Sequence, residues 1–445
     1  MHYSIVTFGC RVNQADSLRL EEHLRDRGAM EAPSSRADLV IVNTCSVTAT
    51  ADQGARQTIR RIARENPSAQ VIVTGCYATR RPDEVGALPG VVHVVRNADK
   101  DRLLDRIDGL VRSLQEATTA ERFGAGDGPC GAGIEPGVAG RTAFTLRVQT
   151  GCEQACAYCI IPTTRGSGRS MPVAAVVAEV ERIASAGFLE IALAGVHLGS
   201  YGRDLTPRAS LPELLRALAD SRADVLFRIS SLEPMDCTPA VVDVMADSGW
   251  RFAPHFHLPL QHASDRVLTL MRREYTLADY RALVNGILER IPHASIGSDM
   301  IAGFPGEEDA DFAANLAYLP ASGLSHLHVF PYSDRPGTAA SVMAGKVAGP
   351  VVRERSAALR AIGGSLSRRF RQSQVGTERP GLTIDDGTQV VTDNYLKVRI
   401  APGARRNERV VVRIDDVESM TATRIKDLPS ERRAAALAPA IVPSL

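Results

Sequence analysis

The sequence lacks the features that would place it in a membrane or in the secretory pathway. No stretch approaches the roughly 18 consecutive apolar residues that a membrane-spanning helix needs. The amino terminus contains an apolar segment, but no basic region precedes it and no small-residue cleavage pattern follows it. We therefore expect a cytoplasmic protein without a membrane partner. Its eight cysteines should stay reduced and serve metal binding or catalysis rather than disulfides.

Lysine is also scarce, and is confined to Lys100, Lys346, Lys397 and Lys426. Almost every cation is therefore an arginine, which reflects either a general compositional bias or the use of the planar guanidinium for phosphate binding. The formal net charge of +1 does not decide whether nucleic acid is a partner, because a basic patch can lie on a balanced protein. The length of 445 residues indicates roughly three domains.

Three cysteines are clustered in the segment RVQTGCEQACAYCIIPTTRG, as Cys152, Cys156 and Cys159. Thiolates are the ligands of iron–sulfur clusters, and a cluster normally takes four of them. A set of three without a fourth nearby leaves one iron open for a substrate or cofactor. Zinc would require a fourth Cys or His close by, and none lies between Cys159 and His197. The spacing therefore favours a cluster with one open iron over a zinc site.

Residues 1–115 alternate short apolar segments with helical patterns, which predicts a parallel sheet covered by helices on both faces. Cys10, Cys45 and Cys76 each end one of the predicted strands. In such a sheet these ends share the edge at which ligands bind. A single cysteine there could be only a small apolar residue, but three at equivalent positions predict a second cluster site with three thiolates. Helices are predicted at Ala15–Arg27, Thr50–Glu65 and Asp101–Leu114.

Residues 116–137 are rich in Gly and Ala and predict a linker, in which Cys130 is interpreted as an incidental thiol. Residues 138–370 contain six strand patterns separated by helical ones, which predicts a partial (β/α)6 barrel with its active site at the carboxyl ends of the strands. The loop with Cys152 follows the first of these strands. The other strand ends carry polar residues and glycines: Gly195, His197, Gly199, Ser230, Ser231, Glu233, Gln261, His262, Asp299, Gly303, Tyr332, Ser333 and Arg335.

Three histidines, His255, His257 and His262, are concentrated near the fourth barrel strand. His255 and His257 alternate along the strand and could face a metal together, but no carboxylate or Cys stands at an accepted ligand spacing. Substrate contact or packing is the favoured interpretation. Cys237, in EPMDCTP, is predicted to be a thiol without a chemical role.

Residues 371–433 have a β-rich pattern with turn residues between the strands, which predicts a small antiparallel barrel, and residues 434–445 form a tail. Tyr395 and several arginines are concentrated in this region. Such a surface could bind RNA phosphates while the ring stacks on a base, or it could be an ordinary solvated face. The arginines are Arg399, Arg405, Arg406, Arg409 and Arg413.

The segment around Cys152, with Tyr158 in the aromatic position before Cys159, resembles the signature of the radical S-adenosylmethionine (radical SAM) enzymes. The three-domain order resembles the methylthiotransferases of that group, in which the first domain is flavodoxin-like and the last is a TRAM domain. The motifs that carry this likeness are GCRVNQ, NTCSVT, TGCYA, GVHLGSYG, SSLEP, HLPLQHASDRVLTLMRR, DMIAGFPGE and FPYSDRPGT. GCRVNQ resembles the MtaB branch, which acts on N6-threonylcarbamoyladenosine beside the anticodon of tRNA.

The resemblance implies two [4Fe-4S] clusters, one on Cys152, Cys156 and Cys159 and the other on Cys10, Cys45 and Cys76, together with S-adenosylmethionine, with Tyr158 at the cofactor site. It implies that a radical formed from S-adenosylmethionine removes a hydrogen from adenine C2 and that the second cluster takes part in sulfur donation. The implied partners are the tRNA anticodon loop, an electron donor such as flavodoxin or ferredoxin, and a sulfur source.

Two kinds of alternative stay open at this stage. Within the family, other branches act on isopentenyladenosine in tRNA or on an aspartate of a ribosomal protein. Outside it, the chain could be a non-catalytic iron–sulfur protein that binds RNA, or a radical SAM enzyme of another type.

Overall fold

A computed structural model of the protein describes residues 1–100, 103 and 142–427. The predicted linker 116–137 with Cys130, the predicted tail 434–445, and nearly all of the predicted helix Asp101–Leu114 lie outside the described residues. Within the described residues, no helix combines the length and the apolarity that a membrane crossing requires.

The first domain is a parallel sheet of strand order β2-β1-β3-β4-β5. This is the strand order of flavodoxin-like sheets. Such sheets bind ligands at the carboxyl ends of the two neighbouring strands from which the chain winds in opposite directions across the sheet. Here that point lies between β1 and β3. The elements are β1 (His2–Thr7), α1 (Arg11–Asp26), β2 (Met30–Glu31), β3 (Leu39–Thr44), α2 (Ala49–Glu65), β4 (Gln70–Gly75), α3 (Cys76–Arg80), α4 (Pro82–Gly86) and β5 (Val91–Val95).

Strand β3 shows why this sheet is covered on both faces. Its residues are all buried, and successive side chains on a strand point to opposite faces. Val40 and Val42 share a core with Ile59 of α2, whereas Leu39 and Ile41 share the core on the other face with Leu24 of α1. A continuous run of apolar residues is therefore the pattern that a doubly covered parallel strand requires.

The second domain is an open barrel made of two three-stranded parallel sheets, β6-β9-β10 and β11-β12-β13. A parallel bridge between Phe227 and Phe252 joins the two sheets. The strands are β6 (Phe144–Arg147), β9 (Glu190–Ala194), β10 (Leu226–Ile229), β11 (His255–His257), β12 (Ser295–Ala302) and β13 (His326–Pro331). The larger helices are α7 (Val173–Ser185), α8 (Leu211–Ala219), α9 (Pro239–Asp247), α10 (Asp265–Leu270), α11 (Leu277–Arg290), α12 (Asp309–Tyr318) and α13 (Gly349–Gln374).

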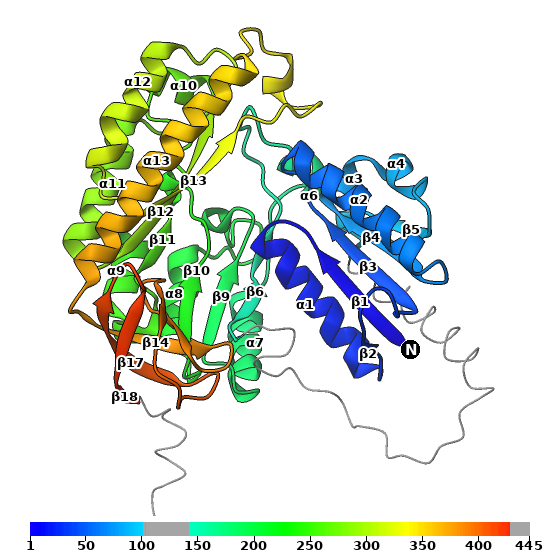
Figure 1. The fold of residues 1–445 in the computed structure, drawn as a ribbon, viewed down its shortest axis with the longest axis horizontal. Coiled ribbons are helices and arrows are strands. Elements are labelled where there is room, and N and C mark those ends of the chain that lie inside the picture. The colour runs from blue at the N-terminus through cyan, green and yellow to red at the C-terminus, as the bar shows by residue number, and fades with distance from the viewer. Residues whose placement is uncertain (101–102, 104–141, 428–445) are drawn as a thin grey trace, which may run out of the picture.

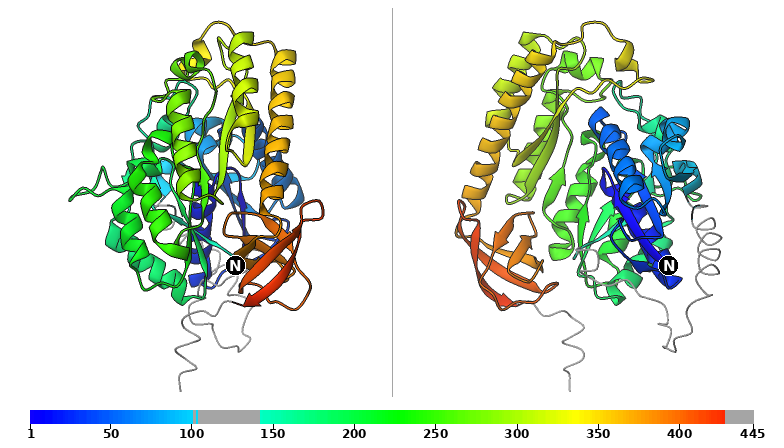
Figure 2. Two further views of the ribbon diagram at one scale, coloured as in Figure 1. Left: turned by 90° about the vertical axis from the view of Figure 1, so that its left-hand side faces the viewer. Right: turned by 45° about the vertical axis from the view of Figure 1, so that its right-hand side comes forward.

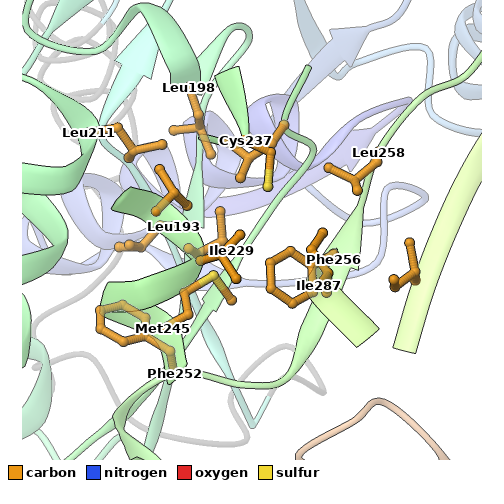
Figure 3. Close-up of a cluster of buried hydrophobic side chains, with 14 of the residues drawn as sticks. Leu193, Leu198, Leu211, Ile229, Cys237, Met245, Phe252, Phe256, Leu258 and Ile287 are labelled. Carbon is orange, nitrogen blue, oxygen red and sulfur yellow. The ribbon is translucent and has the colours of Figure 1, made fainter. Parts of the chain in front are cut away.

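Cys237 lies in the apolar core between these strands and helices. Its side chain is buried among Leu198, Ile229 and Leu258, as Figure 3 shows, and burial raises the pKa of its thiol to about 12. The thiol is therefore protonated at neutral pH and poorly suited to metal binding, because the thiolate is the ligand.

We expect the Cys237→Ala variant to keep its activity within about twofold and to lose about 1 kcal/mol of stability, as ordinary single substitutions do. Product formation and thermal unfolding of the reconstituted protein measure both effects. Complete loss of activity would show that this thiol has a chemical role.

The third domain is a closed barrel of strand order β14-β15-β16-β18-β17. Most of its strand pairs are antiparallel, and β16 closes onto β18 in the parallel direction. The strands are β14 (Glu378–Ile384), β15 (Gln389–Thr392), β16 (Lys397–Arg399), β17 (Arg409–Asp416) and β18 (Thr421–Asp427). The fold class predicted from the sequence is thus confirmed. A flavodoxin-like α/β domain is followed by an open α/β barrel and then by a small β-barrel.

Figures 1 and 2 show how the domains are arranged. The first domain lies beside the open barrel, and α13 runs along the outside of the barrel down to the third domain. Ion pairs hold these contacts: Arg335 of the barrel domain donates to Asp52 of α2 at 2.9 Å, and Arg409 of β17 donates to Asp224 at 2.6 Å. Arg409 therefore docks the third domain onto the barrel rather than presenting its charge to RNA.

Candidate active site

The cysteines of the first domain meet at one edge of its sheet. Cys10 follows β1, Cys45 follows β3, and Cys76 begins α3 directly after β4. Cys45 and Cys76 are buried, whereas Cys10 is exposed. The structure therefore brings three residues that are far apart in sequence to the ligand-binding edge predicted for them.

Gly9 makes this convergence possible. Its φ of 94° is in the left-handed region, and a Cβ atom at this position would lie 2.6 Å from Cβ and 2.7 Å from Sγ of Cys45. Only glycine fits this approach, because any larger residue would both strain the backbone and displace the Cys45 side chain.

We expect Gly9→Ala to lose most of the iron bound by the first domain, since Cys45 must move away. Gly28→Ala is the matched control. Gly28 also has a positive φ, 75°, but nothing lies within 4 Å of a Cβ placed there, so that this variant should lose only about 1 kcal/mol of stability. Iron content after reconstitution distinguishes the two, and equal iron in both variants would contradict the role given to Gly9.

The second cysteine set lies on the loop between β7 (Gln149–Thr150) and α6 (Ile161–Arg165). The backbone of Ala157 anchors this loop by donating to the carbonyl of Met271 at 3.0 Å and accepting from the amide of Ala340 at 2.8 Å. Cys152, Cys156 and Cys159 are partly exposed. They follow the first barrel strands and so lie on the face predicted to be catalytic.

A buried ionic network joins the two cysteine sets. Arg165 ends α6, six residues after Cys159, and donates to Asn13 Oδ1 of α1 at 2.5 Å; it also lies 3.6 Å from Asp16. Asp16 in turn pairs with Lys100 at 2.6 Å and with Arg147 of the barrel. This network fixes the first domain against the barrel through residues next to both cysteine sets.

A cavity of about 840 Å³ opens between the domains. Cys10 and Arg11 of the first domain, strand-end residues of the barrel and Tyr395 of the third domain line it. A cavity of this size can hold a nucleoside-sized ligand. All three domains therefore contribute to one site.

Comparison with known proteins identifies the family. Residues 2–96 match the family described as uncharacterized protein family UPF0004, and residues 146–319 match the radical SAM superfamily. The threonylcarbamoyladenosine tRNA methylthiotransferase MtaB of Aquifex aeolicus is 34% identical over 407 residues, which cover 90% of this chain and 96% of that protein. The chain belongs to the MtaB-like methylthiotransferase family.

Two further comparisons agree with this assignment. The tRNA-2-methylthio-N(6)-dimethylallyladenosine synthase of Paenarthrobacter aurescens is 30% identical over 395 residues, which cover 84% of this chain and 73% of that protein. The structure of the radical S-adenosylmethionine methyltransferase TsrM from Kitasatospora setae shares the fold, with a TM-score of 0.53, 18% identity and 77% of each chain covered. This methylthiotransferase is therefore an enzyme that uses S-adenosylmethionine and [4Fe-4S] clusters.

The surroundings of the six sulfurs fit thiolate ligands. Donor groups point at five of them. The amide of Val47 lies 3.5 Å from Cys45 and the amide of Gln154 lies 3.4 Å from Cys152. The side chain of Asn97 donates to Cys76 at 3.6 Å, Arg273 donates to Cys156 at 3.1 Å, and the amide of Ile161 donates to Cys159. Such hydrogen bonds stabilise sulfur ligands and tune clusters. Burial raises the pKa of Cys45 to about 11 and that of Cys159 to about 12, so that iron binding must displace protons there.

The spacing of the sulfurs also bears on the zinc alternative. In the part of the chain that the structure describes, only His257, Asp299 and His328 bring three ligand atoms within 4.8 Å of one another. Neither cysteine set does so, and each is therefore spread more widely than the ligands of one zinc ion. A multi-iron cluster fits both sets better.

His197 is a hydrogen-bonding neighbour of Cys152. Its Nε2 lies 2.7 Å from Asp236. Burial lowers the pKa of His197, but hydrogen bonds to Asp236 and Cys152 outweigh that effect and raise the pKa to about 9. A protonated imidazole has no lone pair for a metal, so that His197 is suited to donate a hydrogen bond and not to serve as a fourth ligand.

The structure places a carboxylate, that of Asp299, between two of the cavity histidines. No carboxylate stands at ligand spacing along the chain, yet the neighbouring strand β12 places Asp299 Oδ1 3.0 Å from His257 Nε2 and 3.2 Å from His328 Nδ1. Burial raises the pKa of Asp299, but these two hydrogen bonds outweigh it and lower the pKa to about 2. All three residues line the cavity, joined by hydrogen bonds to the one carboxylate.

The other strand-end residues divide into two groups. Gly195, Ser230 and Ser231 line the cavity. His262 is instead buried against Asn315, and Arg335 and Ser333 contact the first domain. The ring of Tyr158 packs edge to face on Phe304, with centroids 6.4 Å apart, beneath the cysteine loop.

Sequence reasoning singled out neither Arg165 nor Arg273 as a site residue. Arg165 stands in TTRG directly after the cysteine loop and Arg273 in LTLMRR. The closeness of Arg165 to the three-cysteine segment, six residues after Cys159, is the signal that could have identified it. Arg273 comes from a distant helix end, so that only the fold shows its contact with Cys156 and its ion pair with Glu233.

Proposed function

We propose that this enzyme adds a methylthio group to C2 of N6-threonylcarbamoyladenosine beside the anticodon of tRNA. In this proposal Cys152, Cys156 and Cys159 hold one [4Fe-4S] cluster and Cys10, Cys45 and Cys76 hold the other. With S-adenosylmethionine bound, the clusters supply the radical chemistry and the sulfur transfer.

The observation that carries the proposal is that both three-cysteine sets lie next to one interdomain cavity. Cys10 of the first set lines the cavity, and so do Ile161 and Arg165 of the helix that follows the second set. Three thiolates leave one iron of a cluster open, and each set has three. Arg165, which follows the second set, also lies near Cys76 of the first. Burial lowers the pKa of Arg165, but the neighbouring Cys76 and Asp16 outweigh burial and raise that pKa. These contacts support the proposal that the two sets serve one site.

The protein's own residues position the reactants. Donors at the sulfurs favour the thiolate form, and Arg273 places a positive charge against Cys156. Tyr158 packs below the loop and is proposed to contact the cofactor. Tyr395, whose side chain is 45% exposed, presents an aromatic face to the cavity on which a base can stack.

The choice of nucleoside rests on the relatives. The Aquifex aeolicus protein, named for threonylcarbamoyladenosine, is covered over 96% of its length, whereas the dimethylallyladenosine synthase of Paenarthrobacter aurescens is covered over 73%. The proposal also requires an electron donor such as flavodoxin or ferredoxin and a sulfur source. It places the reaction in the cytoplasm, where tRNA is.

The proposal is tested with the reconstituted enzyme, S-adenosylmethionine, a reductant and a sulfide source. Two anticodon stem-loop RNAs serve as substrates, one with threonylcarbamoyladenosine and one with isopentenyladenosine at the same position. Mass spectrometry of the nucleosides should detect the methylthio product only from the first. Product only from the second would show that the substrate belongs to another branch, and product from neither would contradict tRNA as the substrate.

A further inference from the structure

Arg11 is a cation that lines the interdomain cavity without a neutralising partner. It follows Cys10 directly, and its Nη2 donates to the hydroxyl of Tyr395 at 3.0 Å. Its guanidinium carbon lies 5.8 Å from the centre of the same ring. Within the described residues the structure gives Arg11 no carboxylate partner. A guanidinium held in this way is available to bind an anion.

Tyr395 is fixed in an unusual conformation that holds Arg11. Its φ of 72° is in the left-handed region, which costs a non-glycine residue about 1–3 kcal/mol and is often associated with functional sites. Asn394 braces the turn by donating to Gln374 Oε1 at 2.8 Å. Below the ring, Arg228 stacks at 4.7 Å from its centre. The positive charge of Arg228 is neutralised by Glu190, whereas that of Arg11 is not.

The whole cavity carries an excess of positive charge. Arg11, Arg165 and Arg371 line it, and Asp299 is the one carboxylate among its lining residues, all of which lie in the described part of the chain. Arg165 is paired with Asp16 behind the lining, so that the excess rests on Arg11 and Arg371. Asp299 is already engaged by His257 and His328. A ligand that carries an anionic group therefore suits this cavity better than an apolar one.

We propose that Arg11 binds the carboxylate of the threonylcarbamoyl group, and that Tyr395 positions Arg11 for this contact. This inference rests on the proposed function. The threonylcarbamoyl side chain ends in a carboxylate, whereas an isopentenyl group carries no charge. Arg11 and Cys10 both line the cavity, where the proposal places the nucleoside. Its planar fork matches a carboxylate in two parallel hydrogen bonds. Arg11 is thus a specificity-determining residue.

The test compares two stem-loop RNAs, one with threonylcarbamoyladenosine and one in which a neutral carboxamide replaces its carboxylate. Wild type should prefer the carboxylate by roughly 10- to 100-fold in kcat/KM, the value of a charge-assisted hydrogen bond. Arg11→Gln should lose roughly that factor on the carboxylate substrate and little on the carboxamide, so that the preference disappears. Arg353→Gln is the control, because Arg353 is exposed and is not among the cavity-lining residues.

Two further variants distinguish the charge of Arg11 from its planar geometry and from its contact with Tyr395. Arg11→Lys retains the charge but not the fork and should keep part of the preference. Tyr395→Phe removes the hydroxyl that Arg11 contacts but keeps the ring, and should raise KM for the carboxylate substrate more than it lowers kcat. Iron content is measured for each variant, because Arg11 adjoins Cys10.

The outcomes separate this inference from the proposed function. If wild type modifies both RNAs equally, or if Arg11→Gln slows both to the same degree as a backbone phosphate contact would, the role given to Arg11 is wrong and the proposed function stands. If wild type modifies neither RNA but modifies the isopentenyl substrate, the proposed function is wrong and the role of Arg11 is wrong with it.

Discussion

Cys156→Ala is expected to abolish product formation and to lower the iron content from about eight to about four per chain, because each [4Fe-4S] cluster holds four irons. Even the outer-shell partners of metal ligands cost about 10- to 100-fold when they are removed, so that loss of a ligand should reduce activity further, by more than about a thousandfold. Cys76→Ala should show the same loss of iron from the other cluster.

Cys237→Ala is the matched control for both variants, since it removes a buried thiol from the same chain without touching either cysteine set. Iron analysis, visible absorption and product mass spectrometry are measured on all three. Full iron in Cys156→Ala or in Cys76→Ala would contradict the ligand assignment for that set.

Asp16→Asn is expected to loosen the contact between the first domain and the barrel. It leaves the buried charges of Lys100 and Arg165 without their carboxylate, and breaking a buried ion pair in this way costs about 3–5 kcal/mol. The midpoint of thermal unfolding should fall by about 3–5 °C. Asp26→Asn is the control on the same helix. Asp26 is exposed at the carboxyl end of α1, where a negative charge is not favoured by the helix dipole.

The pH dependence of this contact has a defined direction. Burial raises the pKa of Asp16, but Lys100, Arg147 and Arg165 outweigh burial and lower it from 3.8 to about 2. A carboxyl whose pKa is lowered on folding contributes stability above its ordinary pKa and loses that contribution as the pH falls through the folded value. The difference between wild type and Asp16→Asn should therefore shrink between about pH 4 and pH 2. A difference that does not change with pH would contradict an ionic role for Asp16.

The sequence was sufficient for the main strands of the first two domains and for the edge at which Cys10, Cys45 and Cys76 meet, but not for the separate two-residue strands β2, β7 and β8 (Arg169–Ser170). Strand β3 was recognisable because it begins with the unbroken apolar run LVIV, as expected of a strand covered on both faces. The carboxyl ends of parallel strands share one edge, so that Cys10, Cys45 and Cys76 could be placed together without coordinates. These inferences depend only on local periodicity and on the chirality of βαβ connections.

The contacts between domains could not be inferred in this way. Arg409 was grouped with arginines that could bind RNA, yet it pairs with Asp224, and no local pattern records which charge another domain supplies. Tyr395 was placed on the surface of the third domain, whereas the docking of that domain turns its ring into the cavity beside Arg11. Asp299 and His257 meet because two strands are in register, which spacing along one strand cannot show.

Nucleoside mass spectrometry of tRNA from cells that lack this protein tests the central claim most directly. The cells are complemented with wild type or with Cys10→Ala. The 2-methylthio form of threonylcarbamoyladenosine should be absent without the protein and should return only with wild type. If this nucleoside is unchanged by the deletion, or if Cys10→Ala restores it as well as wild type does, the proposed substrate or the proposed role of the first cysteine set is wrong.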